Sequence, residues 1–197
     1  MTKNTQTIET TRLILRKFDK NDAEEMFNNY LSSDKVTKFL TFQTYKNVKE
    51  AENYLEFVIN EYKKDRAYRW CIVLKETKQV IGAIDAVSFN EALNEATIGY
   101  CLSDKYWHKG IMSEAFSAVI KYLFEKENVN RIQATHDVNN PNSGKVMQKC
   151  GLKFEGIHRQ AGINNTGICD SAHYAILRED YVILNSNKKT DNLYRLT

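Results

Sequence analysis

The chain has 197 residues, of which 42% are hydrophobic and 27% charged, with a formal net charge of +3 at pH 7. This length fits one domain with its own core, and the dispersed charge lacks the clustered basic face that nucleic-acid binding favours. No apolar run is long enough to span a bilayer, and Met1–Gln6 lacks an apolar signal segment, so we expect a cytoplasmic protein with no membrane and no specific nucleic acid as partner.

Cysteine and histidine residues occur in the chain without the spacing of a metal site. No C-x-x-C pair is present, and three of the cysteines lie in apolar segments, which favours buried, reduced thiols. The four cysteines are Cys71, Cys101, Cys150 and Cys169. The histidines do not join them at ligand spacing, so we expect no metal site.

The first third of the chain predicts one strand followed by two helices. Arg12–Phe18 is a β-rich run, and Asn21 with Glu24 three residues later is typical of a capped helix start. Asn47 and Glu50 repeat that spacing at the start of a second helix. We therefore expect two helices to precede the main strands.

The middle of the chain predicts three consecutive strands. Tyr68–Leu74 and Val80–Phe89 are β-rich runs whose short separation favours an antiparallel hairpin. After a turn at Asn90–Asn94, Ala96–Leu102 forms the third run, with Gly99 in its interior. An interior glycine indicates a bulge or a place where another backbone comes close.

A glycine loop joins the third of these strands to a helix, which we expect from Ser113 to about Glu127. The loop holds one glycine, Gly110, so it fits neither the G-x-G-x-x-G dinucleotide motif nor the G-x-x-x-x-G-K-[ST] phosphate loop. Exposed amides at a helix N-terminus still attract a phosphate group, because the helix dipole places partial positive charge there. The loop therefore predicts a phosphate-bearing ligand.

The last third of the chain continues the alternation of strands and helices. Arg131–His136 alternates as a strand and completes a strand, helix, strand crossover, which should be right-handed. Asn140 and Pro141 suit the N-cap and first position of the next helix, and Gly151 suits its left-handed end. Two strands and a polar tail follow, at Lys153–Ala161, Cys169–Leu177 and 185–197. No linker interrupts residues 1–184, which we expect to form a single domain.

Three stretches resemble the GNAT superfamily of N-acetyltransferases, and within it the branch of ribosomal-protein N-terminal acetyltransferases (RimJ/RimL-type). Trp107–Ala115 resembles the W-x-K-G-x-M-[ST]-E-A loop of that branch, and Glu9–Arg16 resembles its T-x-R-L-x-L-R start. Asn140–Gly156 resembles the second signature of the family, N-x-x-S-x-x-[VL]-x-x-K-x-G-[FL]-x-x-E-G. The resemblance runs from Glu9 to Asp180, with the two signatures in the expected order.

The resemblance implies an α/β (α+β) GNAT fold. In that fold a mixed, mostly antiparallel central sheet of about seven strands is flanked by about four helices and is splayed between its fourth and fifth strands. The splay admits the pantetheine arm of acetyl-CoA, which is the cofactor that the resemblance implies. The residues expected to bind it are Cys101, Leu102, His108, Lys109, Gly110, Ile111, Met112, Ser113, Asn140 and Ser143.

The resemblance also implies direct transfer of the acetyl group to a primary amine. A backbone amide near Cys101 or Leu102 is expected to stabilise the oxyanion. The position of the usual tyrosine acid holds Met147, so Ser143 is the expected acid that protonates the departing thiolate. Its place in the first turn of a helix favours that role.

The general base is left open by the sequence. The position where the family often has a glutamate holds Thr97, and Glu95 lies two residues earlier on the same strand face. A carboxylate that acts directly or through water is the usual solution, because the acceptor ammonium must lose a proton before it attacks. Neither residue can be assigned from the sequence.

Several of these residues also have a purely structural interpretation. For Gly110 it is a tight turn, for Asn140 a helix cap and for Ser143 a solvated hydroxyl. We expect Glu95 to be a surface charge beside a turn, and His136 to be a satisfied core histidine. Packing is the expected role of the two tryptophans, Trp70 and Trp107.

Two functions from different classes compete at this point. The first is an acetyl-CoA-dependent N-acetyltransferase. The alternative is a non-catalytic acyl-CoA-binding module, which is supported by Met147 and Thr97 at the positions of the usual acid and base. A nucleotide oxidoreductase is a third interpretation. The acceptor, a protein N-terminus or a small amine, is expected to be selected by the loops Val36–Tyr45 and Arg159–Cys169. The sequence does not decide between a monomer and a homodimer.

Overall fold

One sheet, with the strand order β1-β2-β3-β4-β5-β6-β8-β7, organises the part of the chain that the computed structural model describes, residues 4–194 with side chains up to Ser186. The strands are β1 (Ile8–Glu9), β2 (Leu13–Arg16), β3 (Arg69–Leu74), β4 (Val80–Asn90), β5 (Glu95–Leu102), β6 (Arg131–Asp137), β7 (Lys153–Asn164) and β8 (Gly167–Leu177). Neighbours pair antiparallel except β5 and β6, which are parallel. The predicted mixed and mostly antiparallel sheet is confirmed, with the short β1 added at one edge.

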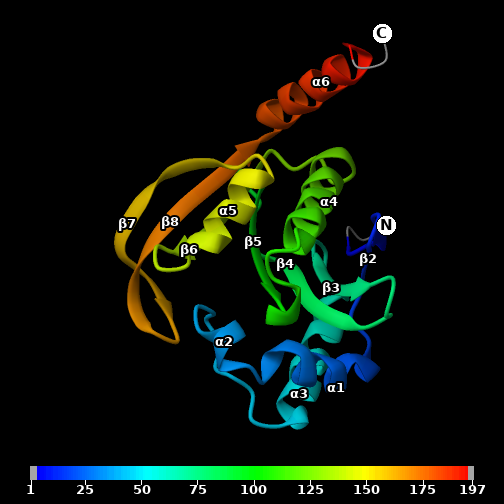
Figure 1. The fold of residues 1–197 in the computed structure, drawn as a ribbon, viewed down its shortest axis with the longest axis vertical. Helices are drawn as coiled ribbons and strands as arrows, with labels where there is room; N and C mark the ends of the chain where they lie inside the picture. The colour runs from blue at the N-terminus through cyan, green and yellow to red at the C-terminus, as the bar shows by residue number, and fades with distance from the viewer. Residues whose placement is uncertain (1–3, 195–197) are drawn as a thin grey trace.

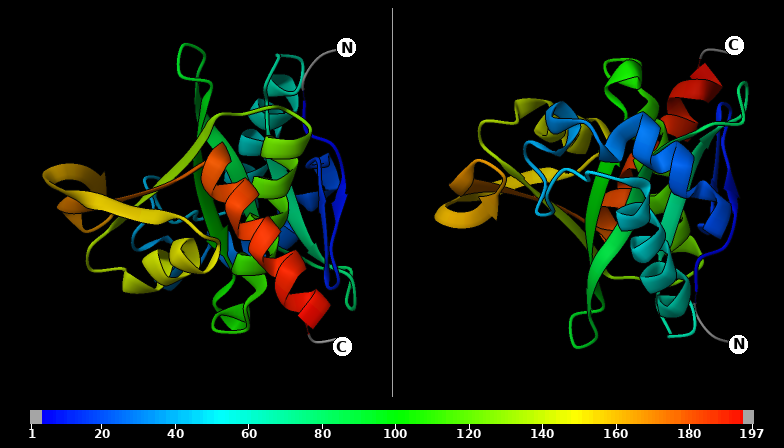
Figure 2. Two further views of the ribbon diagram at one scale, coloured as in Figure 1. Left: turned by 90° about the horizontal axis from the view of Figure 1, so that it is seen from above. Right: turned by 90° about the horizontal axis from the view of Figure 1, so that it is seen from below.

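Helices cover both faces of this sheet. They are α1 (Ala23–Met26), α2 (Asp34–Thr37), α3 (Val48–Glu61), α4 (Ile111–Glu125), α5 (Pro141–Lys149) and α6 (Arg178–Tyr194). Two short 3₁₀ helices, η1 (Lys20–Asp22) and η3 (Asp104–Tyr106), and one π-helical segment, η2 (Phe27–Leu31), accompany them. Figure 2 shows α4 and α5 in front of the sheet from above, and α1 and α3 in front of it from below. Figure 1 shows α6 extending away from the sheet. None of the helices in residues 4–194 has the length and apolar character needed to cross a bilayer.

The alternation of side chains along each strand builds a separate core on each face of the sheet. Trp70 and Ile84 pack with Phe116 of α4, whereas Cys71 packs with Leu55 of α3. Trp70 is fully buried, which confirms its predicted packing role. Because successive residues of β5 point to opposite faces, this strand serves both cores at once.

The sheet opens between β5 and β6. The parallel pairing joins Glu95 to Arg131 and continues only as far as Thr97 and Gln133. Beyond Thr97 the two strands part, while β5 stays paired with β4 and β6 stays paired with β8. The splay predicted between the fourth and fifth strands is thereby confirmed, since β5 and β6 are those two strands of the expected set.

One of the two predicted helix caps is right and the other is wrong. Asn47 accepts a hydrogen bond from the Glu50 amide at the start of α3, as expected. At the first helix the cap is Asp19, which forms a capping box with Asp22, and the amide of Asn21 donates to the Asp19 carboxylate. A carboxylate two residues earlier thus takes the place that we gave to Asn21.

The irregularity expected at Gly99 lies mainly in the neighbouring strand. The register of β4 against β5 shifts between Ala86 and Ser88, so Val87 is the bulged residue. A Cβ atom on Gly99 would stand 2.9 Å from the Val87 side chain. Gly99 therefore makes room for a side chain of the bulge, and not for a second backbone.

Two boundaries near the C-terminus were predicted wrongly. Residues 162–164, expected in a loop, extend β7, because they pair with β8 and leave only a tight turn at Asn165 and Thr166. The boundary placed between residues 184 and 185 falls inside α6, so the expected polar tail is helical as far as Tyr194. Residues 195–197 of that tail, and residues 1–3, lie outside the described residues.

Candidate active site

The glycine loop turns sharply into α4. Gly110 is the N-cap of α4 with φ +72°, a left-handed conformation that glycine adopts without the steric cost of a Cβ atom. The helical hydrogen bonds begin with the Glu114 amide, which donates to the Gly110 carbonyl over 3.0 Å. The amides of Ile111, Met112 and Ser113 therefore have no acceptor within the helix. This geometry is suited to bind a phosphate group.

Two cations stand beside the loop. Arg12 donates from Nη1 to the Lys109 carbonyl over 2.9 Å and forms an ion pair with Glu114 over 2.6 Å. Lys149 comes from α5, and its Nζ atom lies 3.8 Å from the point where a Cβ atom on Gly110 would stand. The first-turn amides of α4 are thus accompanied by positive charge from two other parts of the chain, which favours an anion further.

Trp107 anchors the start of the loop. Its backbone amide donates to the Asp104 carbonyl over 3.2 Å, and its indole Nε1 donates to the Leu102 carbonyl over 2.8 Å. The Lys35 ammonium lies 5.2 Å from the centre of its ring. The predicted packing role is confirmed, since Trp107 packs against the core on both faces of the sheet. The next residue, His108, has φ +59°.

Leu102 and Cys101 differ in the direction of their amides. The Ser103 amide donates to the Ile81 carbonyl over 2.8 Å, so Ser103 is in a hydrogen-bonded pair with β4. Hydrogen-bonded and non-hydrogen-bonded residues alternate along an antiparallel pair, so Cys101 also bonds to β4 while the Leu102 amide points away from it. That direction is the open side of β5. Of the two expected oxyanion donors, the geometry favours Leu102, and Cys101 contributes its side chain to the α3 face.

Ser143 lies at the same opening, from the side of α5. The hydroxyl of Tyr100, on β5, is 2.9 Å from Ser143 Oγ and 3.1 Å from the Ser143 carbonyl oxygen. The Tyr100 ring packs on Phe116, and burial raises the pKa of its hydroxyl, so it stays protonated at neutral pH. Met147, at the position of the usual acid, is 1% exposed and belongs to the core.

Tyr100 is the residue of this site that we did not single out from the sequence. It stands two positions before Leu102, on the strand that we predicted from Ala96 to Leu102. The period-two alternation of that strand places both side chains on one face, toward α4. That pattern was available in the sequence, but the distance to Ser143 required the fold.

Asn140 is in the N-cap position of α5, but its side chain makes no capping hydrogen bond in the structure described. Its backbone has φ −110° and ψ +62°, and its amide donates to the Asp137 carbonyl over 2.7 Å. The cap that we expected from its side chain is therefore absent. Gly151 does end the helix with φ +91°, as predicted.

Glu95 is not the surface charge that we expected. It is 8% exposed, and its two carboxylate oxygens face Arg131 Nε at 2.5 Å and Gln133 Nε2 at 3.0 Å. Gln133 also donates to the Thr97 hydroxyl over 3.0 Å. These contacts join β5 to β6 just before they part, so Glu95 closes the end of the splay.

His136 is only half satisfied, in contrast to its predicted role as a satisfied core histidine. Its Nδ1 atom lies 2.7 Å from the Asp137 carbonyl oxygen, but its Nε2 atom is buried without a partner in the described structure. The backbone of Gly144 comes so close that a Cβ there would stand 2.6 Å from Nε2. The ring stacks on Tyr174 and supports the start of α5.

The expectation of burial holds fully for one of the four cysteines. Cys71 is buried, and the other three are half-buried. Within residues 4–186 no three side chains of histidine, cysteine, aspartate or glutamate gather as ligands of a metal ion would.

The two loops that we expected to select the acceptor meet in the fold. Asn165, at the turn between β7 and β8, donates from its side-chain amide to the Thr37 carbonyl over 2.9 Å and to the Phe42 carbonyl over 2.7 Å. Gln43 donates in turn to the Asn165 side-chain oxygen over 2.5 Å. Figure 1 shows the end of the β7–β8 hairpin curving toward α2. Both segments lie on the side of the sheet that carries α1 and α3.

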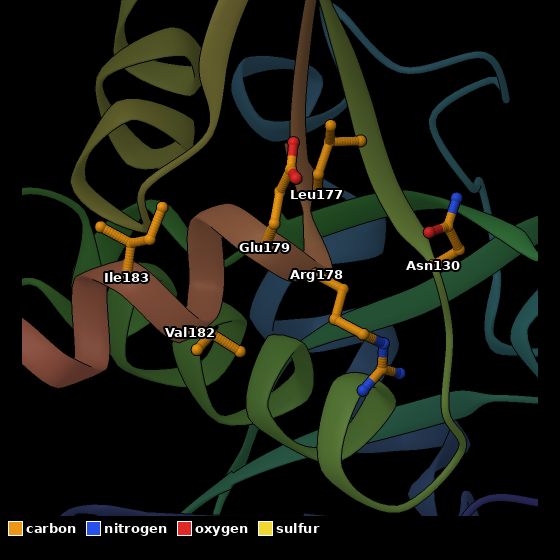
Figure 3. A pocket seen from close by; sticks show the side chains of 6 residues that line it. All are labelled: Asn130, Leu177, Arg178, Glu179, Val182 and Ile183. Carbon is orange, nitrogen blue, oxygen red and sulfur yellow. The ribbon is translucent and has the colours of Figure 1, made fainter.

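A separate hollow lies at the base of α6, away from the loop before α4. Figure 3 shows the side chains that line it: Asn130, Leu177, Arg178, Glu179, Val182 and Ile183. Arg178 is engaged with the Val129 carbonyl, and the remaining side chains do not include a paired nucleophile and base. We therefore do not place the chemistry in this hollow.

Comparison with known proteins identifies relatives of this chain. The chain is 31% identical over 171 residues to the uncharacterized N-acetyltransferase YoaA of Bacillus subtilis, covering 87% of this chain and 96% of that protein. It is 33% identical over 113 residues to the ribosomal-protein-serine acetyltransferase of Escherichia coli, covering 56% of this chain and 62% of that protein.

A solved structure and a family profile complete the comparison. The acetyltransferase (GNAT family) of Bacillus anthracis superimposes with a TM-score of 0.78 at 27% identity, over 88% of this chain and 99% of that one. The family profile described as an acetyltransferase (GNAT) domain matches residues 12–153, a span that contains the splayed strands, the loop of Gly110 and Ser143. The chain therefore belongs to the GNAT family of acetyltransferases.

Proposed function

We propose that this acetyltransferase uses acetyl-CoA as donor and transfers the acetyl group directly to a primary amine, with the α-amine of a protein N-terminus as the first candidate acceptor. One juxtaposition carries the proposal. The unpaired amides that follow Gly110 lie at the end of β5, and the gap between β5 and β6 opens beside them after Thr97. Such an arrangement binds a diphosphate and receives the arm attached to it in the gap.

The residues of the loop and of α5 divide the work of binding. The amides of Ile111, Met112 and Ser113 bind the diphosphate, and the Lys149 ammonium balances its charge. The amides of His108, Lys109 and Gly110 extend the same row. Asn140 adds a side-chain amide that its own helix does not use.

The chemical step rests on three groups around the splay. Acetyl-CoA, when bound, supplies an acetyl thioester that is open to attack by an amine. The Leu102 amide donates a hydrogen bond to the thioester oxygen as negative charge develops there. Ser143, held by Tyr100, gives a proton to the departing sulfur. The rate enhancement by Ser143 is modest, because a thiol with a pKa of about 8.5 leaves readily at neutral pH.

The acceptor is assigned by class. A relative named for a ribosomal-protein serine favours a protein N-terminus over a small amine. The contact of Asn165 with the carbonyls of Thr37 and Phe42 supports this choice, since two separate segments border the acceptor side. Action in the cytoplasm is part of the proposal, and a homodimer stays a prediction.

The test is binding followed by turnover. The purified chain is titrated with acetyl-CoA by calorimetry, then incubated with acetyl-CoA and peptides that begin with serine or alanine, next to polyamines and free amino acids. Free thiol is measured with a thiol reagent and the acetylated product by mass spectrometry. Acetylation of a peptide α-amine supports the proposal, and acetylation of small amines alone moves the acceptor to that class.

The alternative is a non-catalytic acyl-CoA-binding module. It is supported by tight acetyl-CoA binding without thiol release for any acceptor. The contact between Ser143 and Tyr100 speaks against it, because a module that only binds has no need of a hydroxyl pair at the opening. An oxidoreductase would require NAD to raise the melting temperature more than acetyl-CoA does.

A further inference from the structure

A buried polar cluster lies on the α3 side of the strands that border the splay. Asp85, on β4, pairs in register with Gly99 of β5, and its side chain faces α3. Its Oδ2 atom lies 3.4 Å from the Tyr54 hydroxyl of α3 and 3.3 Å from Arg69 Nη1 of β3. Tyr30 belongs to the same cluster from η2. The cluster thus draws on four elements of the fold.

One oxygen of Asp85 is left without a partner. The residue is 8% exposed, and Oδ1 is buried with no hydrogen-bond partner among the described residues. The Tyr30 hydroxyl, 1% exposed, also lacks a partner there. A buried carboxylate oxygen without a donor is costly, so its persistence calls for a role in binding or chemistry. A protonated amine is the kind of ligand that would satisfy it.

The position of Asp85 suits the acceptor side of the reaction. Ser143 and Tyr100 approach the opening from the face of α4 and α5, whereas Asp85 and the Cys101 side chain lie on the face of α3. Gly99 has no side chain of its own there, and the Val87 side chain packs against it on this face. About 10 Å of strand separates Gly99 from the oxyanion donor Leu102, a span that an acceptor amine and one water fill.

Two other carboxylates near the splay, Glu95 and Asp137, are already occupied. Both oxygens of Glu95 are taken, by Arg131 and Gln133. Both oxygens of Asp137 are taken as well, by the Asn139 amide at 2.8 Å and the Asn164 side chain at 2.8 Å. A base needs a lone pair that can accept a new proton, and among these three carboxylates Asp85 has a free oxygen.

We propose that Asp85 is the general base, a role that rests on the proposed function: its Oδ1 atom takes a proton from the ammonium form of the acceptor, directly or through one water. The neutral nitrogen then forms a bond to the acetyl carbon, and the carbon–sulfur bond breaks. The remaining extra proton on nitrogen passes to Ser143, replacing the one that Ser143 gives to sulfur, and Asp85 releases its own proton to solvent. One amide and one thiol result.

The protonation of Asp85 agrees with that geometry. Burial raises the pKa of Asp85 to about 6, and the Arg69 guanidinium, the Tyr54 hydroxyl and the Trp70 backbone amide act against the rise. The Cys101 thiol and the Tyr30 hydroxyl also face the cluster, and burial raises the pKa of both, so they stay neutral at pH 7. Asp85 is therefore ionised at pH 7, with a pKa close enough to neutrality for an efficient base.

The decisive experiment compares Asp85→Asn with Glu95→Gln at two pH values, with acetyl-CoA and a peptide that the wild type acetylates. At pH 7 the α-amine is mostly protonated, so Asp85→Asn should lower kcat/KM by about 10- to 100-fold. At pH 9 the amine is neutral by itself, and the variant should recover to within about threefold of the wild type. Glu95→Gln should stay within about threefold at both pH values, and acetyl-CoA affinity should be unchanged in both variants.

The outcomes separate the two proposals. A full rate for Asp85→Asn at pH 7, or an equal loss at pH 7 and pH 9, overturns the role of Asp85 and leaves the acetyltransferase intact. Lack of turnover by the wild type with every amine, despite acetyl-CoA binding, overturns the proposed function and the base with it. Asparagine keeps the shape of aspartate and removes a buried charge, so folding is retained, and Asp85→Ser is a second variant that should give the same pH pattern.

Discussion

The hydroxyl of Tyr100 lies 2.9 Å from Ser143 Oγ, and it reaches from β5 to the first turn of α5 across the mouth of the splay. Because the Tyr100 ring is fixed on Phe116, its hydroxyl holds Ser143 in one orientation. We expect Ser143 to act on the departing thiolate and Tyr100 to act through Ser143. Tyr100 is then a positioning residue.

Substitution at this pair should show that dependence. Ser143→Ala should lower kcat by about tenfold, less than the loss of an acid that serves a poor leaving group. Tyr100→Phe should lower kcat by less, and the double variant should be no slower than Ser143→Ala, because the two act as one unit. Stopped assays of thiol release measure each rate. Additive losses in the double variant would mean that Tyr100 has a role of its own.

Substitution of Gly110 tests whether the backbone amides at the start of α4 bind the cofactor. Gly110→Ala puts a Cβ on a left-handed residue, which should cost about 1 kcal/mol of stability and tilt the first-turn amides of α4. Acetyl-CoA affinity, measured by calorimetry, should fall. Gly167→Ala is the matched control, since Gly167 also has positive φ and open space around it but lies at the β7–β8 turn. Equal loss of affinity in both variants would count against a specific role of the loop.

Substitution of Lys149 tests whether its positive charge contributes to acetyl-CoA binding. Lys149→Ala should weaken acetyl-CoA binding several-fold at low salt, and the difference from the wild type should shrink as salt screens the anion. Lys121→Ala removes the same charge from the exposed side of α4 and serves as control. Titrations at two salt concentrations give the comparison. An effect of Lys149→Ala that does not change with salt would point to lost packing instead.

The strands and the loop could be anticipated because each depends on local pattern, whereas the splay was expected from the family resemblance. Apolar and polar residues alternate along Ala96–Leu102, and apolar residues recur at helical spacing from Ile111 onward. Gly110 lies between these two patterns, so the sequence alone places a strand, a turn and a helix. The boundaries were less certain: α4 begins at Ile111, two residues before the expected start, because Gly110 already serves as N-cap. Local signals therefore located the loop that we propose to bind the cofactor.

The acceptor side could not be read in the same way, because its contacts join residues far apart in the chain. Asn165 reaches Phe42 across 123 positions, and Asp85 meets Tyr54 across 31. Asp85 lies inside an apolar strand pattern, and no nearby residue in the sequence marks it as functional. Glu95 was therefore the carboxylate that the sequence analysis considered as the general base. Only the fold shows that Glu95 is occupied by Arg131 while Asp85 keeps a free oxygen.

Asn165 is expected to hold the acceptor loop in place. Asn165→Ala removes two hydrogen bonds to backbone carbonyls of residues 37 and 42, so the segment between α2 and α3 should loosen. KM for the peptide acceptor should rise about tenfold while acetyl-CoA affinity stays unchanged, since the cofactor loop lies elsewhere. Thr166→Ala, at the next position, is the control. A change in acetyl-CoA binding instead would contradict the division into two sides.

Asp85 also predicts an unusual dependence of stability on pH. Burial raises its pKa to about 6, and the neutral form is therefore favoured in the folded state. The stability that the neutral Asp85 side chain contributes is fully present below the pKa of Asp85 in the unfolded chain, about 4. It is lost as the pH rises through the folded-state pKa of about 6. Asparagine stays neutral throughout, so Asp85→Asn should be more stable than the wild type by about 2–3 kcal/mol at pH 7.5, with the gap closing toward pH 4.

Asp137 provides the control of opposite sign. Burial alone would raise its pKa, but hydrogen bonds from the Asn139 amide and the Asn164 side chain lower it on balance. Its charged form therefore stabilises the fold above the unfolded pKa, and this stability is lost as pH falls. Asp137→Asn should then be less stable than the wild type at pH 7.5, with the gap narrowing as the pH is lowered. Urea unfolding of the wild type, Asp85→Asn and Asp137→Asn at pH 4.5, 6 and 7.5 measures these differences. A loss of stability in Asp85→Asn at pH 7.5 would mean that the Asp85 carboxylate stabilises the fold and is not kept free for a substrate.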